Sequence, residues 1–275
     1  MQIIEQVLKL FMTTDSEKYS DLEIHKLLLK TVSPTVKQYK KSNKQHQSLF
    51  QKDENIDRLI VLRCFAFELW NSIIQGKLHN EIYGRRINVI ETALLRCEIA
   101  TDENIALFTN GYGLSAMSNL RLMLEAFSIS KYLWKKGENE AKRFQDYREY
   151  QKSEFDGTKA DIEDKHDESF YKPYGWISEP ELRSLSHLVK ELKNAKYDEL
   201  FKISNNYVHA TPYSLEKVWE LNHKRMGYFP IDLSELIRLN EFILTDFLCF
   251  VVDRFVESDE KDFYKLFLKI IVDRM

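Results

Sequence analysis

Glycine and proline are scarce in this chain, with 8 glycines and 5 prolines among 275 residues. Both residues break helices or mark turns, so their scarcity favours long helices with few connections. Strict alternation of apolar and polar residues, the pattern of a half-buried strand, is also rare. Hydrophobic residues make up 44% of the chain and charged residues 30%, which is typical of a globular protein. The sequence therefore predicts an all-α fold, a multi-helix bundle.

The sequence marks of several enzyme classes are also missing. The chain has no glycine-rich phosphate loop, no paired-cysteine metal site, no His-Glu-x-x-His and no nucleophile elbow. Their absence argues against nucleotide hydrolases, zinc hydrolases and serine hydrolases in their standard forms, and we expect neither a metal nor a cofactor. The formal net charge of −3 gives no support for a global attraction to nucleic acid, although it is compatible with a local basic patch.

Cysteine is rare as well. Cys64, Cys97 and Cys249 are an odd number of cysteines, widely spaced on segments that we predict to be helical. Such residues are more often small buried hydrophobes than disulfides or ligands, which indicates the reducing cytoplasm. The apolar residues 1–12 are few and are interrupted by Glu5 and Lys9. We therefore expect neither a signal peptide nor a membrane span, and no membrane partner.

Apolar periodicity divides the chain into an N-terminal helical segment, residues 1–54, and a helical bundle domain, residues 55–275, unless the two form one continuous domain. Asp102 is expected to cap a separate helix that begins at Glu103. The acidic stretch around His166 is expected to be a solvated loop. Helices are predicted over residues 3–12, 21–31, 55–75, 83–100, 114–134, 138–152, 181–193, 197–209, 233–256 and 262–272.

The predicted helix 114–134 is apolar on most sides, which indicates a buried central helix roughly 30 Å long. Charged residues inside such a helix must be paired or hydrogen-bonded, because an unpaired buried charge costs several kcal/mol, roughly. Arg121 precedes Glu125 by four residues, the less favourable order for a surface ion pair. The polar stripe therefore either fixes the register of the bundle or lines a polar pocket. Its members are Ser118, Arg121, Glu125, Ser128 and Tyr132.

A second polar group, Ser204–His209, ends another predicted helix. Asn205 and His209 are four residues apart and share one helix face. A histidine at a helix C-terminus binds the last carbonyls and is favoured there in its charged form. The alternative role for His209 is that of a general acid–base group near neutral pH.

The order of these helices and polar groups resembles that of a bacterial family known as domain of unknown function 5677. The matching elements are Arg121-Leu-Met-Leu-Glu125, then a polar helix with Arg143, Tyr147 and Tyr150, and then Ser204–His209. The resemblance covers approximately residues 60–220. The family name implies no activity.

The chain also resembles, more distantly, the HEPN helical domains, many of which are metal-independent ribonucleases of toxin and antiphage systems. Their motif is an arginine, a polar residue, three further positions and a histidine. Asn205 and His209 have the right spacing, but Ser204 stands where the motif has its arginine. The resemblance implies that His209 is the acid–base group. A ribonuclease would need a substitute for the missing arginine, and our hypothesis is that Arg121 is this substitute.

Three functions fit these residues. The first is a binding or scaffold module of a bacterial defence or regulatory system, working as a homodimer or with a protein partner. The second is a HEPN-like ribonuclease that acts on RNA, with His209, Arg121 and Asn205 as catalytic residues. The third is a small-molecule sensor with a polar pocket at Arg121 and Glu125. The predicted ligand-binding residues are Glu125, Ser128, Tyr147, Tyr150 and Ser204.

Overall fold

The computed structural model describes residues 54–73, 84–109, 113–159, 162, 166–208, 233–256 and 258–272, and isolated residues between 23 and 37. These ranges hold helices and irregular connections, with no strand among them, so the predicted all-α fold is confirmed. The predicted helix 3–12 lies outside the described residues, as does much of 21–31. The elements are α3 (Glu54–Ser72), α4 (Gly84–Thr109), α5 (Gly113–Lys136), α6 (Glu138–Asp156), the 3-10 helix η5 (Pro180–Leu182), α7 (Leu185–Glu191), α8 (Ala195–Val208), α10 (Leu233–Phe255) and α11 (Ser258–Val272).

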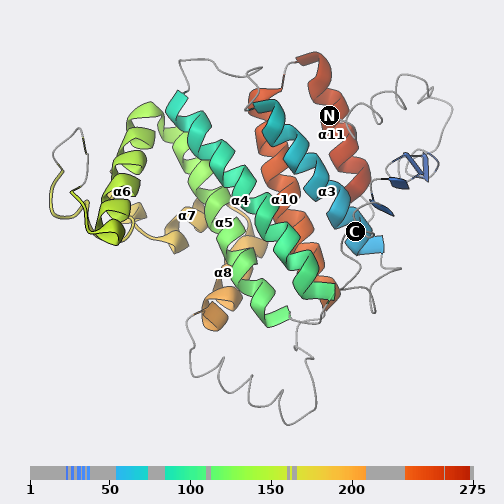
Figure 1. Cartoon of the computed structure of the whole chain (residues 1–275), viewed down its shortest axis with the longest axis horizontal. Helices are drawn as coiled ribbons and strands as arrows, with labels where there is room; N and C mark the ends of the chain where they lie inside the picture. The colour runs from blue at the N-terminus through green and yellow to red at the C-terminus, as the bar shows by residue number, and fades with distance from the viewer. Residues whose placement is uncertain are drawn as a thin grey trace, which may run out of the picture.

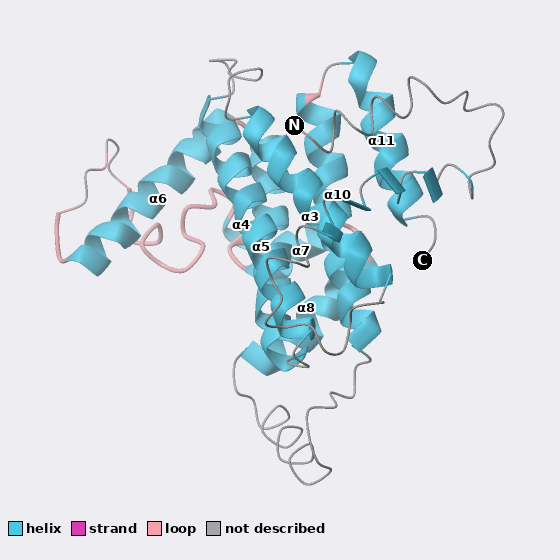
Figure 2. Ribbon diagram, turned by 45° about the vertical axis from the view of Figure 1, so that its right-hand side comes forward, coloured by secondary structure: helices cyan, strands magenta, loops and turns pink. Residues whose placement is uncertain are grey.

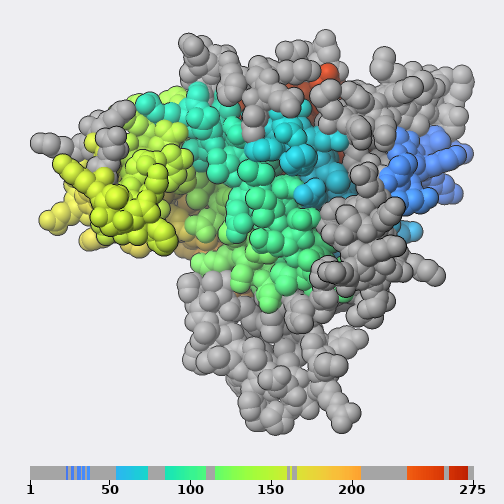
Figure 3. Space-filling view, viewed as in Figure 1, coloured from blue at the N-terminus to red at the C-terminus, as the bar shows by residue number. Residues whose placement is uncertain are grey.

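The predicted central helix corresponds to α5, which contacts α4, α6, α7, α8 and α10. Long helices α4 and α10 pack against α5, α3 packs against α4 and α10, and α11 packs against α10 (Figure 1). By contrast α6 projects from the side of this bundle in both ribbon views (Figures 1 and 2). Side chains of α4 and α6 form part of the same face of the molecule (Figure 3).

Two apolar clusters hold these helices together. The larger one fills the bundle, and α5 contributes Met117, Leu120, Met123 and Leu124, all completely buried. Burial of such side chains stabilises the fold by roughly 1.5–3 kcal/mol each. The smaller cluster attaches α6 and the following segment to α4, α5 and α7. It consists of Val89, Tyr132, Leu133, Tyr147, Phe170, Trp176, Ile177 and Leu188.

The expected helix boundary at Asp102 is wrong, because α4 continues from Gly84 to Thr109. Two of its interior polar residues, Thr101 and Asn104, contact α10. Asn104 donates from Nδ2 to Oδ1 of Asn240 on α10 over 2.6 Å, and Asn240 donates back to Oγ1 of Thr101 over 3.0 Å. All three side chains are buried. The expected cap, Asp102, is not part of this buried contact between α4 and α10 and pairs instead with Arg63 of α3, with 3.6 Å between Oδ1 and Nε.

The beginning of α4 is held by a residue of another helix. Glu138, the first residue of α6, accepts from the backbone N–H of Arg85 over 3.1 Å and from that of Arg86 over 3.4 Å. It also accepts from Nε of Arg86 over 2.8 Å. A carboxylate is favoured at this place, because the first N–H groups of a helix lack partners within the helix and carry partial positive charge.

The predicted helix 181–193 is shorter than expected. Its first residues form η5, and α7 begins at Leu185 after Ser184, whose hydroxyl accepts from the backbone N–H of His187 over 3.3 Å. This side-chain cap sets the start of α7.

Candidate functional site

The polar stripe of α5 joins this helix to elements that follow it in the chain. Arg121 donates from Nη1 to Oδ1 of Asn205 on α8. Its guanidinium lies 5.2 Å from the centre of the Phe201 ring. In the described part of the chain Arg121 forms no ion pair with Glu125, although the two stand one turn apart. The structure thus brings Arg121 and Asn205 together, whereas His209 lies outside the described residues.

Glu125 is engaged by a residue that the sequence did not single out. Its Oε1 atom accepts from the hydroxyl of Tyr174 over 2.5 Å. Burial raises the pKa of Tyr174, and the negative charge of Glu125 raises it further. Tyr174 therefore stays a neutral donor across the physiological range. It lies in an irregular segment between Pro173 and Gly175, where periodicity gives no information.

The turn that carries Tyr174 is tightly packed. Tyr174 has φ 60°, and a Cβ atom on Gly175 would lie 2.2 Å from the carbonyl oxygen of Ser169. Arg143 of α6 binds the next two carbonyl groups, with Nε 2.9 Å from the oxygen of Trp176 and Nη2 3.3 Å from that of Gly175. These contacts hold the Tyr174 hydroxyl against α5.

The other predicted ligand-binding residues have protein partners. Ser128 donates to the carbonyl of Leu124 over 2.7 Å, and Ser204 donates to that of Phe201 over 3.1 Å. Both hydroxyls are therefore bonded within their own helices, while Ser118 is exposed. Tyr147 packs edge-on against Phe170 and Tyr150 against Tyr171, with ring centres 5.6 and 4.8 Å apart.

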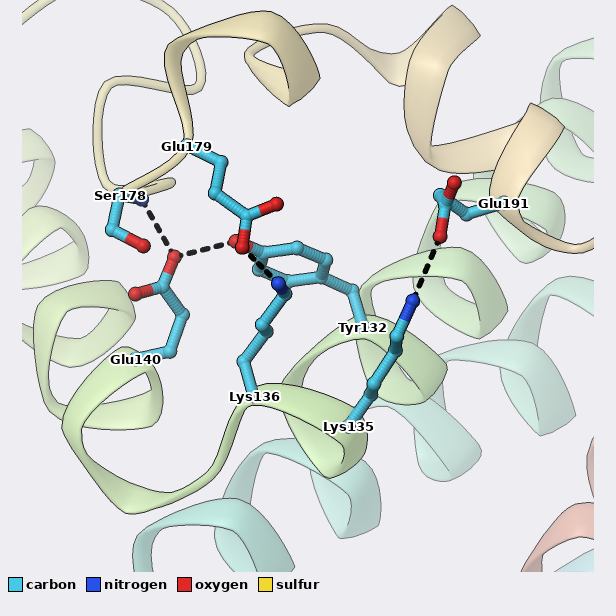
Figure 4. Close-up of polar contacts among 7 residues, drawn as sticks. All are labelled: Tyr132, Lys135, Lys136, Glu140, Ser178, Glu179 and Glu191. Carbon is cyan, nitrogen blue, oxygen red and sulfur yellow. Dashed lines mark hydrogen bonds and ion pairs between the residues drawn. The ribbon is translucent and has the colours of Figure 1, made fainter.

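The end of α5 is fastened by a group of polar contacts (Figure 4). Glu140 accepts both the hydroxyl of Tyr132 and the backbone N–H of Ser178 at its Oε1 atom, each over 2.7 Å. Burial, followed by this hydrogen bond, raises the pKa of Tyr132. Lys136 pairs with Glu179 beside them (Figure 4). Tyr132, the last residue of the stripe, thus anchors the segment that leads to α7.

The expectation of a solvated loop is wrong at His166. Its side chain is only 5% exposed, and its Nε2 atom lies 3.0 Å from Oδ2 of Asp146 on α6. Its ring stacks on Phe170 with centres 3.7 Å apart. The contacts with the Phe170 ring and with the Asp146 carboxylate together explain why the His166 side chain is buried.

A cavity of 450 Å³ lies between α4, α5 and α6. Its wall is mainly apolar, and Glu125 contributes to it from α5. The hydroxyl of Tyr174 donates to Oε1 of this carboxylate, while Oε2 has no hydrogen-bond partner among the described residues. Arg96 and Arg148 are exposed and so stand at the rim. The remaining lining residues are Asn88, Val89, Thr92, Ala93, Leu122, Ala126, Ile129, Phe144 and Gln145.

The charged rim of this cavity was not found in the sequence, because Arg96 and Arg148 resemble ordinary exposed helix residues. Arg96 forms a long ion pair with Glu103, with 3.9 Å between Nη1 and Oε1. Arg148 pairs with Glu149, the next residue in the chain, over 2.8 Å. Such exposed pairs are weak, about 0–1 kcal/mol, so an incoming anion competes with them readily.

Comparison with protein families finds a match over residues 89–226, half of the chain, to a family described as a family of unknown function (DUF5677). The comparison with curated proteins found no match, and neither did that with solved structures. Across the residues that the structure describes, no helix is long and apolar enough to cross a membrane. No group of three or more His, Cys, Asp or Glu residues in those same ranges is placed to hold a metal ion.

Proposed function

The chain belongs to the DUF5677 family, and we propose that it is a binding module for an amphipathic small molecule. The ligand has an apolar body, a hydrogen-bond donor directed at Glu125 and an anionic group at the arginine rim. The observation that carries this proposal is the 450 Å³ cavity with an available carboxylate oxygen in a mainly apolar wall. Small-molecule sites of roughly 300–1,000 Å³ commonly combine apolar walls with few polar groups.

Glu125 supplies the polar contact inside the cavity. Its Oε1 atom is held by Tyr174, which fixes the carboxylate, and Oε2 is left to accept from a ligand N–H or O–H group. A hydrogen bond to a charged acceptor contributes about 1.5–3 kcal/mol. This geometry differs from the pocket expected at Arg121 and Glu125 together, because Arg121 binds Asn205 and does not line the cavity.

The cavity can be tested with 1-anilinonaphthalene-8-sulfonate, a fluorescent probe that combines aromatic rings, an N–H donor and a sulfonate. We expect saturable binding to the folded protein. Thr92→Phe, which adds a ring at an exposed position of the lining, should abolish it. Arg96→Gln and Arg148→Gln should each weaken binding about threefold, since an exposed charge contributes up to about 1 kcal/mol.

Two variants serve as controls. Glu199→Phe adds the same ring at an exposed position of α8, and Arg238→Gln removes an exposed charge of α10; neither residue lines the cavity. Both should bind the probe as the parent does. Equal binding by Thr92→Phe and the parent, with unchanged thermal unfolding, would refute the proposal.

A second candidate function is that of a metal-independent ribonuclease with His209 as acid–base group. The observation in its favour is the hydrogen bond between Arg121 and Asn205, which brings an arginine of α5 to the polar residue four positions before His209. Such an arginine would stabilise the charge that develops on a phosphate. A role in bacterial defence, with two copies pairing their histidines, is part of this candidate.

The ribonuclease candidate predicts cleavage of labelled single-stranded RNA in the presence of a metal chelator. His209→Ala and Arg121→Ala should abolish cleavage while thermal unfolding stays cooperative. His187→Ala, at an exposed position of α7, is the matched control and should cleave as the parent does. Intact RNA with the parent protein, or full cleavage by the His209 and Arg121 variants, contradicts the candidate.

A further inference from the structure

A second hollow, of 280 Å³, lies between α5, α7 and α10 on a different face of α5. At 100° per residue, Lys131 and Lys135 stand on the side of α5 away from Leu122 and Ala126, which line the first cavity. We infer that this hollow is a binding site for a small phosphate-bearing molecule. The site is independent of the proposed function, because the two hollows share no lining residue.

The charge of the lining is strongly positive, although the whole chain carries a formal charge of −3. The rim bears four cations and one carboxylate, that of Glu191. Lys135 pairs with Glu191 over 3.0 Å (Figure 4). The other three cations, Lys131, Lys193 and Arg254, have no acidic ion-pair partner within the described ranges. A bound anion with two or more negative charges would offset this excess of positive charge.

Aromatic rings hold two of these cations in place. Nζ of Lys131 lies 5.3 Å from the centre of the Phe127 ring. The guanidinium carbon of Arg254 lies 5.8 Å from that of Trp134. Contacts of this kind contribute about 0.5–1 kcal/mol at exposed sites and limit the freedom of the side chain. The cationic heads are therefore partly ordered before an anion binds, which lowers the entropy cost of binding.

Lys193 supplies an independent observation. It follows α7 with φ 55°, a left-handed conformation that is usual for glycine at the end of a helix but strained for lysine. Its backbone N–H bonds the carbonyl of Lys190 over 2.9 Å, so the turn itself requires only a backbone. A lysine at such a position adds a charge to the rim at the expense of stability, and strained residues of this kind cluster at ligand sites.

The volume of the hollow and its apolar lining indicate which class of ligand it can bind. Leu188, Leu192 and Phe250 provide apolar surface below the cations, which suits a small organic group attached to a phosphate. Ammonium groups bind phosphates as point charges and need no fixed orientation. A hollow of 280 Å³ accommodates a small molecule and not a nucleic-acid strand.

Helix dipoles offer another explanation, because cations are favoured at helix C-termini. It applies to Lys135 and Arg254, which stand in the last turns of α5 and α10. It does not account for Lys131, which stands before the last turn of α5. The two explanations differ in outcome: a dipole role changes stability alone, whereas a binding site changes affinity for an anion.

Calorimetric titration with inorganic pyrophosphate at low ionic strength tests the site. Lys131→Gln and Arg254→Gln should each raise Kd about threefold, and the double variant about tenfold, as expected for exposed charges. Glu191→Gln should tighten binding, because it removes the opposing carboxylate and releases Lys135. Lys152→Gln, an exposed residue of α6, is the matched control and should leave Kd unchanged.

Lys193→Gly distinguishes most clearly between an effect on stability and an effect on anion binding. It should raise the thermal unfolding midpoint, since glycine adopts this conformation without strain, and at the same time weaken pyrophosphate binding about threefold. No heat of binding for the parent, or equal Kd values for all variants, would overturn the inference. Tight binding of a single-stranded oligonucleotide that pyrophosphate does not displace would also overturn it.

Discussion

Replacement of Tyr174 by phenylalanine isolates the hydrogen bond that fixes Glu125. The ring remains, and with it the packing of this residue against both apolar clusters. Only the 2.5 Å contact between the hydroxyl and Oε1 of Glu125 is lost. Hydrogen bonds to charged groups contribute about 1.5–3 kcal/mol, and water in the adjacent cavity can solvate the released carboxylate. We therefore expect Tyr174→Phe to lower the free energy of unfolding by about 1.5 kcal/mol, at the lower end of that range.

A double-mutant cycle shows whether the loss arises from this contact. Glu125→Gln keeps an acceptor oxygen for Tyr174 but removes the charge, so we expect a smaller loss of about 0.5–1 kcal/mol. The combined variant should lose less than the sum of the two, with a coupling of about 1 kcal/mol. Urea unfolding at pH 7, followed by far-ultraviolet circular dichroism, measures the free energy of unfolding of the parent and of each variant. The dependence of this free energy on urea concentration should be the same for all of them.

Tyr171→Phe is the control for this cycle. The residue is 40% exposed, and its hydroxyl has no hydrogen bond to the described residues. It should stay within about 0.3 kcal/mol of the parent, as surface substitutions usually do. A Tyr174→Phe variant that is equally neutral, or two single effects that simply add, would show that Tyr174 does not hold Glu125.

Three further changes test other parts of the fold. Gly175→Ala should cost about 3 kcal/mol or more in thermal or urea unfolding, because its Cβ would lie 2.2 Å from the backbone oxygen of Ser169; parent-like stability would contradict this close approach. Burial raises the pKa of Glu98 above its ordinary value of 4.5. Its contribution to stability is therefore complete below pH 4.5 and is lost as the pH rises through the raised pKa, so Glu98→Gln should flatten the decline in unfolding free energy above pH 4.5. Burial raises the pKa of Tyr264 from 10.0 to about 12, so its contribution is lost as the pH rises over that interval, and alkaline unfolding of Tyr264→Phe should show a smaller slope there.

Sequence periodicity predicted the helices that are apolar along one face, and the nearly continuous apolar composition of residues 114–134 predicted the buried helix α5. Both patterns can be detected within a single segment of the sequence. Prediction from the sequence failed at Asp102, whose polar side chain resembles a cap. Whether such a residue ends a helix depends on its partner, and Asp102 pairs with Arg63 on another helix, α3. Contacts between residues that lie far apart in the sequence leave no periodic pattern from which they could be predicted.

The same distinction applies to the candidate sites. Arg121 and Glu125 were found because charges on an apolar helix are conspicuous, and the resemblance to DUF5677 that rested on them is confirmed over residues 89–226. Tyr174 was missed because it lies in an irregular segment and acts through a turn closed by backbone contacts. A pocket was predicted at Arg121 and Glu125, but of these two residues only Glu125 lines the first cavity. The second hollow was not predicted, because each hollow is formed by side chains from three helices whose packing no single segment determines.

Glu138 has a consequence for the way the protein opens. Its carboxylate joins the first residue of α6 to the first turn of α4, so α4 and α5, which lie between these points, form a closed loop of chain. The first turn of α4 cannot fray without losing its contacts with the first residue of α6. Amide protons at the two places should therefore exchange with solvent in one shared opening event, so that this helical hairpin behaves as a single cooperative unit.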